Sequence, residues 1–235
     1  MKKLDETKIK ITSINVLKTL KDSYSLTELS RFFSLPEPVI SRYLNGHVLP
    51  RRERAEKIIK KFREDLVNEI LRKKIILSEG KVFSLLNILS DSSLMDILGK
   101  LVFYEFKNVK IKKILTKETM GIPFALEIAK EFNAKLVVAR SKKDLGIDEF
   151  LETKRTFKDG TYSYLYVPKH LIKKRDSVLI ADDSIRSGST LRALVNLCRS
   201  ARANVVGAAF IVSVGKIIQK VGRKFTFPTV CFLNI

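Results

Sequence analysis

Four apolar runs in the C-terminal half of this 235-residue chain limit the folds that it can adopt. Helical patterns separate most of these runs, which are VKIKKILT (109–116), AKLVVAR (134–140), SVLIA (177–181) and NVVGAAFIVS (204–213). Strands with continuous apolar side chains are buried on both faces, and strands that alternate with helices are typical of a parallel sheet covered by helices. The sequence therefore predicts an α/β domain in this half of the chain.

The N-terminal part carries short helical patterns instead. The apolar stripes are Ile14, Leu17 and Leu20, then Leu26, Leu29 and Phe33. Ser25 is placed to cap the second helix, and Gly46 suits the left-handed backbone that ends a third helix over about 37–45. A longer helix is expected from Arg51 to about Ile75. We predict an all-α domain over residues 1–65 with a connecting helix to about 75, followed by the α/β domain over residues 76–235.

The net charge of +20 predicts attraction to polyanions, of which nucleic acid is the usual one. The excess is +8 over residues 1–75 and +12 over the rest, so charge alone does not identify the domain that meets the partner. There is no run of 18 apolar residues, and MKKLDETKIKI lacks the apolar core of a signal peptide. We expect a cytoplasmic protein without a membrane partner. Cys198, Cys231 and two histidines give no metal-ligand spacing, so no protein-built metal site is expected.

Residues 26–50, LTELSRFFSLPEPVISRYLNGHVLP, predict two short helices joined by a tight turn, which is the helix-turn-helix arrangement. The second helix would enter the major groove of DNA by its N-terminal end. Arg42 could bond guanine, and the polar residues that follow could contact phosphates. The expected DNA-binding residues are Glu37, Pro38, Ser41, Arg42, Asn45, Arg51 and Arg52. A helix pair that binds protein, or no partner, is the alternative.

The motif S-R-Y-L-N-G-x-x-x-P, residues 41–50, resembles helix-turn-helix domains of the phage-repressor type. In those domains the Asn-Gly pair follows the recognition helix, and the resemblance covers about residues 10–60. It implies double-stranded DNA as a partner. It also implies a homodimer, because one such unit contacts only a half-site.

Two adjacent carboxylates, Asp182 and Asp183, follow the run VLIA, and a loop of small residues follows them. A loop at the carboxyl edge of a parallel sheet is a usual place for a ligand. This loop offers backbone amides, hydroxyls and a helix N-terminus, which are the parts of a monophosphate cradle: Arg186, Ser187, Gly188, Ser189 and Thr190. There is no Gly-Lys-Ser/Thr for a P-loop and no G-x-G-x-x-G for a dinucleotide.

Carboxylates beside a phosphate site would repel a bare anion. They are explained if the ligand is a ribose 5-phosphate, whose 2- and 3-hydroxyls donate to Asp182 and Asp183 while its phosphate lies in the loop. The alternative is that the two acids are helix caps or surface charges at a turn.

The stretch 178–190 has four apolar residues, two acids and a small-residue loop that ends in Thr. It resembles the ribose-phosphate signature of the type I phosphoribosyltransferases. A second element, Lys117-Glu118-Thr119-Met120-Gly121-Ile122-Pro123, resembles that family's pyrophosphate-binding loop. The resemblance covers about residues 90–235 and implies a parallel sheet of that kind with a small hood. It implies phosphoribosyl pyrophosphate with Mg²⁺, bound by the acids, by the loop 186–190 and by Glu118, Thr119, Met120 and Gly121.

The Lys- and Arg-rich stretch ARSKKDLGIDEFLETKRTFKDGTYSY (139–164) could supply a mobile loop for this chemistry, or could be an ordinary solvated loop. By resemblance to orotate phosphoribosyltransferases, Arg140, Lys142 and Lys143 lie where pyrophosphate is bound. The catalytic candidates, if the chain is an enzyme, are Asp183, Lys143 and Arg140. Residues 76–90 and the C-terminal TFPTVCFLNI are candidates for the hood.

The combination of the two domains resembles archaeal regulators described as orotate-phosphoribosyltransferase-like, and the bacterial purine repressor family. It implies a DNA-binding transcription regulator that senses phosphoribosyl pyrophosphate or a nucleotide without significant catalysis. Two alternatives stay open. One is an active purine or orotate phosphoribosyltransferase with an accessory DNA-binding domain, and the other is a non-catalytic structural dimer.

Overall fold

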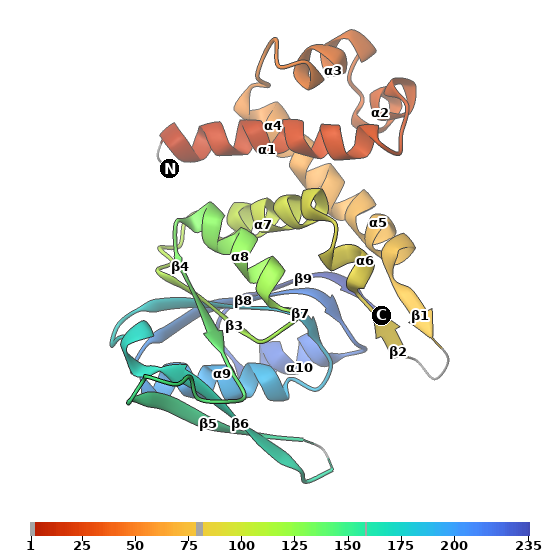
Figure 1. Cartoon of the computed structure of the whole chain (residues 1–235). Coiled ribbons are helices and arrows are strands. Elements are labelled where there is room, and N and C mark those ends of the chain that lie inside the picture. The colour runs from red at the N-terminus through yellow and green to blue at the C-terminus, as the bar shows by residue number, and fades with distance from the viewer. Residues whose placement is uncertain (1–2, 79–81, 158) are drawn as a thin grey trace. The chain divides into compact units, whose positions relative to one another are not determined.

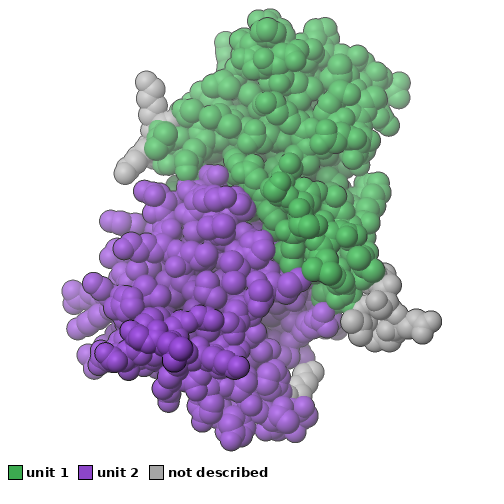
Figure 2. Space-filling view, in the orientation of Figure 1, with its two compact units in different colours: residues 1–108 green, residues 109–235 purple. Residues whose placement is uncertain are grey.

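The computed structural model describes residues 3–78, 82–157 and 159–235. It divides the chain into two compact units, unit 1 over residues 1–108 and unit 2 over residues 109–235, which Figure 2 shows in two colours. The boundary between the two units, after residue 108, lies later in the chain than the expected domain boundary at residue 76. That boundary stays a prediction.

Unit 1 consists mainly of helices, with one antiparallel pair of short strands (Figure 1). The elements are α1 (Lys3–Lys21), α2 (Leu26–Phe33), α3 (Glu37–Leu44), α4 (Arg52–Lys61), a π-helical turn (Phe62–Leu66), α5 (Val67–Lys74), β1 (Ile76–Ser78), β2 (Val82–Ser84), α6 (Leu86–Leu89) and α7 (Ser92–Phe106).

Local signals fix the two short helices α2 and α3 and the turn between them. The Ser25 hydroxyl accepts from the Glu28 amide at 3.2 Å, and the Glu28 carboxylate accepts from the Ser25 amide at 2.7 Å, which is a capping box. Ser34 ends α2 in the left-handed region with φ of 53°, and Gly46 follows α3 with φ of 72°. The expected helices and caps are confirmed. A helix pair does not by itself identify a DNA-binding domain, and that assignment is not confirmed.

The long helix expected over residues 51–75 is interrupted by the π-helical turn and ends at Lys74. Phe62, Leu66 and Val67 are all buried, although 66 and 67 are neighbours in the sequence. The wider turn shifts the helical register by a fraction of a turn, and this lets both neighbours face the apolar interior of unit 1.

Unit 2 is built on a five-stranded parallel sheet with the order β4-β3-β7-β8-β9. Its elements are β3 (Lys113–Lys117), α8 (Ile122–Phe132), β4 (Lys135–Ala139), β5 (Phe150–Thr156), β6 (Tyr162–Pro168), a 3₁₀ turn (Lys169–Leu171), β7 (Ser177–Ile185), α9 (Ser189–Ser200), β8 (Asn204–Ser213), α10 (Ile217–Lys224) and β9 (Thr229–Asn234). Helix α8 covers one face of the sheet, and α9 and α10 cover the other (Figure 1). The predicted α/β class and parallel sheet are confirmed.

The strand order reverses between β3 and β7. The chain leaves β3 toward one edge of the sheet, through α8 to β4, and leaves β7 toward the other edge, through α9 to β8. The loops at the carboxyl ends of β3 and β7 therefore diverge over opposite faces and leave a crevice between them. In open α/β sheets a ligand binds at such a switch point.

Two segments of unit 2 differ from what the sequence predicted. Residues 229–234, expected in the hood, instead form β9, which pairs with β8 through Val230 opposite Ala209 and Cys231 opposite Phe210. Residues 150–156, expected in a mobile loop, form β5 in an antiparallel hairpin with β6. The other hood candidate, 76–90, contains the β1–β2 pair and α6, and its residues 79–81 lie outside the described residues.

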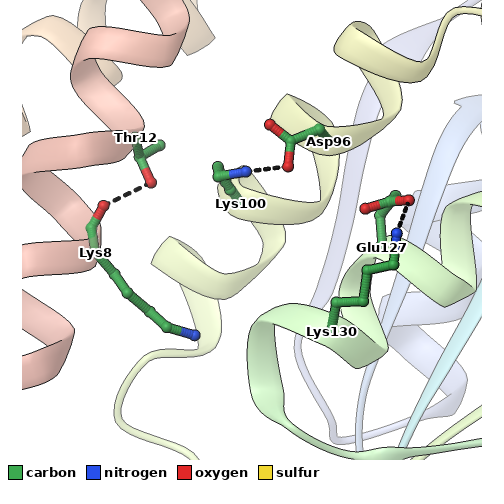
Figure 3. Close-up of polar contacts among 6 residues, drawn as sticks. All are labelled: Lys8, Thr12, Asp96, Lys100, Glu127 and Lys130. Carbon is green, nitrogen blue, oxygen red and sulfur yellow. Dashed lines mark hydrogen bonds and ion pairs between the residues drawn. The ribbon is translucent and has the colours of Figure 1, made fainter.

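Side-chain contacts along the helices explain why segments rich in Lys and Glu become helical. Lys100 pairs with Asp96 along α7 (Figure 3), whereas the Thr12 hydroxyl in α1 donates to the Lys8 carbonyl at 2.8 Å, a local bond that does not stabilise the helix. Lys130 pairs with Glu127 at 2.7 Å along α8. Such pairs stabilise a helix by about 0.2–0.5 kcal/mol each.

Across the described ranges of the chain, no helix is both long enough and apolar enough to cross a membrane.

Candidate active site

A cavity of about 540 Å³ lies at the carboxyl ends of β3 and β7, at the switch point of the sheet. Residues 182–191, from the end of β7 through the loop to the start of α9, supply most of its lining, and residues 117–120 and three single residues complete it. The lining residues are Lys117, Glu118, Thr119, Met120, Ser141, Arg155, Asp182, Asp183, Ser184, Ile185, Arg186, Ser187, Gly188, Ser189, Thr190, Leu191 and Phe210. Every predicted ligand-binding residue lines this cavity except Gly121, which lies directly behind Asp182.

The loop between β7 and α9 has the geometry of an anion cradle. Gly188 takes a left-handed conformation with φ of 70° and turns the chain into α9, whose N-terminus opens on the cavity. The Ser187 hydroxyl accepts from the Ser189 amide at 3.3 Å and donates to the Ser189 hydroxyl at 3.1 Å. Arg192, one turn into the helix, donates to the Ser187 carbonyl at 3.2 Å. Hydroxyls, a helix N-terminus and nearby cations together favour a phosphate.

Asp182 lies in the floor of the cavity, and only 8% of its surface is exposed. One of its carboxylate oxygens accepts from the Asp183 amide at 3.1 Å. Burial, and then the neighbouring Asp183 carboxylate, raise the pKa of Asp182 well above its ordinary value, while Lys117 acts in the opposite direction. Asp183 is less buried and lies beside the open part of the cavity. The two adjacent acids therefore occupy different environments.

The loop after β3 meets the two acids from the other side. The Lys117 ammonium donates to the Glu118 carbonyl at 2.6 Å, and the Glu118 carboxylate accepts from the Ser141 amide at 2.6 Å. That bond from Ser141 is the main cause that lowers the pKa of Glu118. The Glu118–Thr119 peptide bond is cis. Thr119 and Met120 are exposed at the cavity, so their backbones are accessible to a ligand.

Two of the three catalytic candidates do not line the cavity. The Arg140 guanidinium pairs with Glu118 at 3.5 Å and also with Asp144. The Lys143 ammonium lies over the rings of Phe150 and Tyr166 and is 3.5 Å from Glu152. Only Asp183 faces the cavity directly.

Arg155 is a cavity residue that the sequence interpretation missed. It comes from β5, whose alternating charges hid it within a stretch assigned to a loop. Lys117, the first residue of the element 117–123, was not among the expected binding residues. Ser141 and Phe210 were not identified either, because neither belongs to a recognised motif. A prediction of the β5–β6 pairing would have brought Arg155 to the cavity.

The expected DNA-binding residues lie on and after α3 in unit 1. Pro38, Arg42, Asn45, Arg51 and Arg52 are exposed, while Glu37 and Ser41 are half-buried. The Asn45 amide donates to the Ser41 hydroxyl at 3.4 Å, and Arg52 pairs with Glu56 at 3.2 Å. The outward position of Arg42 matches the expectation for a residue that contacts a partner.

Gly121 allows the two loops of the site to approach each other. A β-carbon at this position would lie 2.4 Å from a carboxylate oxygen of Asp182 and 2.5 Å from the Thr116 hydroxyl, and both side chains are buried.

We expect Gly121→Ala to destabilise unit 2 by about 1–3 kcal/mol, as overpacked sites do. Gly222→Ala in α10 is the matched control, because nothing lies within 4 Å of its β-carbon position. It should be neutral or stabilising by about 0.5–1 kcal/mol in a thermal or urea melt. Equal melts for the two variants would contradict this account.

The raised pKa of Asp182 also has a consequence for stability. The folded protein binds the Asp182 proton more tightly than the unfolded chain does, so ionisation of the folded protein costs free energy as the pH rises above 3.8. Asp182→Asn cannot ionise. We expect it to melt above the wild type at pH 7–8, with a gap that closes as the pH falls toward 3.8.

Asp176→Asn is the control, because it should change the melting temperature in the direction opposite to Asp182→Asn. Asp176 is also buried, but it accepts from the Lys173 amide at 3.0 Å and pairs with Lys112 at 3.7 Å. Its removal should lower the melting temperature. If Asp182→Asn behaves as Asp176→Asn does at every pH, the assignment of an electrostatic cost to Asp182 is wrong.

Curated relatives of this chain are enzymes. It is 34% identical over 167 residues to the xanthine phosphoribosyltransferase of Lachnoclostridium phytofermentans, with 67% of this chain and 86% of the relative covered. It is 30% identical over 161 residues to the xanthine phosphoribosyltransferase of Alkaliphilus metalliredigens, with 64% and 77% covered.

Solved structures share the fold of about seven tenths of this chain. The adenine phosphoribosyltransferase of Rhodothermus marinus matches with a TM-score of 0.62 and 23% identity, over 72% of this chain and 98% of that one. The enzyme of the same name from Thermoanaerobacter pseudethanolicus matches with a TM-score of 0.63 and 17% identity, over 71% and 99%.

These comparisons contradict the functional hypothesis favoured in the sequence analysis, a transcription regulator that senses a ribose 5-phosphate ligand without significant catalysis. The named relatives are enzymes, so a regulator without catalysis is wrong as the main interpretation. That hypothesis rested on a helix pair and a basic charge, and neither bears on whether the cavity in unit 2 catalyses a reaction. The phosphoribosyl transferase domain family matches residues 87–227. The chain therefore belongs to the type I phosphoribosyltransferases.

Proposed function

We propose that the chain is an active purine phosphoribosyltransferase. A ring nitrogen of a purine base attacks C1 of phosphoribosyl pyrophosphate, and the bond from C1 to the pyrophosphate oxygen breaks. Pyrophosphate leaves with the electron pair, and the base gives up a proton. The products are a purine nucleoside 5′-monophosphate and pyrophosphate.

One observation carries this proposal: the cradle, the paired acids and the loop 117–121 line a single cavity. The cradle, with Ser187 and Ser189 at the start of α9, suits the 5-phosphate. Asp183, the more exposed acid, is placed to accept from a ribose hydroxyl. The backbone of Thr119 and Met120 faces the same cavity and suits the pyrophosphate. The sugar therefore spans the cavity from one loop to the other, with C1 at the end of the β3 loop.

The chain's own groups contribute chiefly by position and charge. Electrostatic stabilisation of the departing pyrophosphate is the main task, since charge builds up on its oxygens in the transition state. Lys117 lies at the end of β3 and lines the cavity, where its ammonium adds positive charge. The acids hold the ribose in place while C1 acquires positive character, which nearby carboxylates stabilise.

Mg²⁺ fits this donor set. It prefers oxygen ligands and is usually held by one or two carboxylates together with substrate phosphates. Asp183 provides such a carboxylate, and no cluster of three or more His, Cys, Asp or Glu able to hold a metal occurs among the described residues. These residues therefore suit a cation that enters with the pyrophosphate, where it would neutralise part of the leaving group's charge.

Xanthine is the base that the relatives favour. The curated relatives at 30–34% identity are named for xanthine, whereas the solved adenine enzymes share 23% identity or less and indicate the fold alone. Adenine is the alternative substrate. Orotate, the pyrimidine considered from the sequence, has no support from these relatives.

The test is base-dependent release of pyrophosphate from phosphoribosyl pyrophosphate with Mg²⁺, over xanthine, guanine, hypoxanthine, adenine and orotate. We expect turnover with xanthine, and a loss of at least about 10²-fold in kcat/KM for Asp183→Asn, because this exchange removes the charge from a residue of the cavity. Asp159→Asn makes the same change in the exposed turn after β5 and should leave the rate unchanged. No turnover with any of the five bases would disprove the proposal, and a preference for adenine would disprove only the choice of xanthine.

We also propose that residues 1–65 form an accessory module that binds double-stranded DNA, as part of a homodimeric enzyme. The supporting observation is the three-residue connection between α2 and α3, with the exposed Arg42 on α3 and the exposed Asn45 directly after it. Such a pair fits a helix-turn-helix that presents α3 to the major groove. A homodimer would bring two such modules to two half-sites.

This accessory role predicts a specific loss. Arg42→Ala should weaken binding of duplex DNA, and relax its sequence preference, by about 1–3 kcal/mol for a lost contact to a base. Arg223→Ala removes the same charge from exposed α10 and should change binding little. Fluorescence anisotropy with random and selected duplexes at fixed salt measures both. Equal losses for the two variants would indicate attraction by net charge alone.

A further inference from the structure

Arg155 reaches the phosphate cradle from outside the two loops that form it. It lies on β5 opposite Ser163 of β6 and shares its strand face with Leu151, which is buried in the core of unit 2. Helix α9 packs against β5, so this face of the hairpin is turned toward the start of α9. The Arg155 guanidinium donates through Nε to the Ser189 hydroxyl at 3.3 Å and lines the cavity.

The surroundings of Arg155 supply little to balance its charge. Besides the bond to Ser189, its guanidinium lies 4.5 Å from the centre of the Phe157 ring. No ion pair within 4.0 Å joins it to a carboxylate among the described residues. Partial burial lowers the pKa of Arg155, and Asp182 is the one charged group that raises it. One of the five guanidinium donors is bonded to a neutral hydroxyl, and the side chain is half-buried at the cavity, so its other donors are available to the oxygens of a phosphate.

We infer that Arg155 binds the 5-phosphate of the sugar-phosphate substrate. This inference rests on the proposed function and assigns the hairpin β5–β6 as a third wall of the cradle, in addition to the loop 186–190 and the end of α9. Planar guanidinium groups match phosphate oxygens through two parallel hydrogen bonds, and such charge-assisted bonds are the stronger ones. The phosphate would then accept from both Arg155 and Ser189, which already contact each other.

A purely structural role is the competing explanation, in which Arg155 only fastens β5 to α9. The two roles predict different effects when Arg155 is replaced. A fastening residue affects the melting temperature and weakens all ligands equally. A phosphate-binding residue affects ribose 5-phosphate and leaves unphosphorylated ribose and the melting temperature nearly unchanged.

The experiment is calorimetric titration of the full chain with ribose 5-phosphate and with ribose, for the wild type, Arg155→Ala and Arg155→Lys. We expect Arg155→Ala to raise the Kd for ribose 5-phosphate about 10- to 100-fold, the range for a lost charged hydrogen bond. Arg155→Lys should recover part of this loss, since it keeps the charge and loses the fork. Arg199→Ala, at the exposed C-terminal end of α9, removes an equal charge and should bind as the wild type does.

In turnover with phosphoribosyl pyrophosphate, Arg155→Ala should raise KM for that substrate by a similar factor and change kcat little. Unchanged binding of ribose 5-phosphate by Arg155→Ala would overturn this inference and leave the proposed function intact. A fall in melting temperature with equal weakening of both sugars would also overturn it, in favour of the fastening role. If the wild type binds no ribose 5-phosphate at all, the proposed function and this inference both fail.

Discussion

The close approach of Gly121 to Asp182 brings the two loops of the candidate active site next to each other. Parallel pairing of β3 with β7, through Ile114 opposite Leu179 and Leu115 opposite Ile180, brings the ends of the two strands side by side. The strands then diverge, and the absence of a side chain at Gly121 lets the β3 loop lie against the Asp182 carboxylate. The pyrophosphate end and the ribose-phosphate end of the cavity depend on this single contact. A parallel sheet with a reversal of strand order creates the crevice, and the glycine permits it to be narrow.

The same geometry raises the electrostatic free energy of the site when no ligand is bound. Two carboxylates on adjacent residues, one of them buried, disfavour ionisation, and this is what raises the pKa of Asp182. Arg155 and Lys117 line the same cavity, and a carboxylate that offsets the charge of each is the buried Asp182, whose ionisation is disfavoured. An anionic sugar phosphate with free hydroxyls relieves both imbalances, because its phosphate meets the cations while its hydroxyls donate to the acids. Active sites commonly carry such unfavourable electrostatic free energy in the absence of ligand, and this lowers the stability of the folded protein.

Much of this site could be predicted from the sequence, because its signals are local. The run 178–181, the acids 182 and 183 and the small residues 186–190 specify strand, site and helix start in consecutive order, and Ser25 and Gly46 specify helix ends in the same local way. The parts that were missed depend on pairing between distant segments. Charged residues on β5 conceal its strand character until β6 is paired with it. Residues 229–234 were assigned to the hood because a short apolar segment does not itself show that it is the edge strand beside β8. The identity of the base is set by contacts that no local pattern in the chain describes.

The choice between enzyme and regulator could not be made from local patterns either. Both kinds of protein use the same cradle and acids, so the residues that bind a sugar phosphate do not reveal whether the bond at C1 is broken. The relatives, which are named as enzymes, favour the enzyme.

The most direct measurement of the central claim is a crystal structure of the chain with phosphoribosyl pyrophosphate and Mg²⁺. The account predicts the 5-phosphate at the N-terminus of α9, between Ser187 and Thr190, the ribose hydroxyls on the Asp182–Asp183 pair, and the pyrophosphate against Thr119 and Met120. Density for the compound elsewhere, or an empty cavity at saturating concentration, would contradict it.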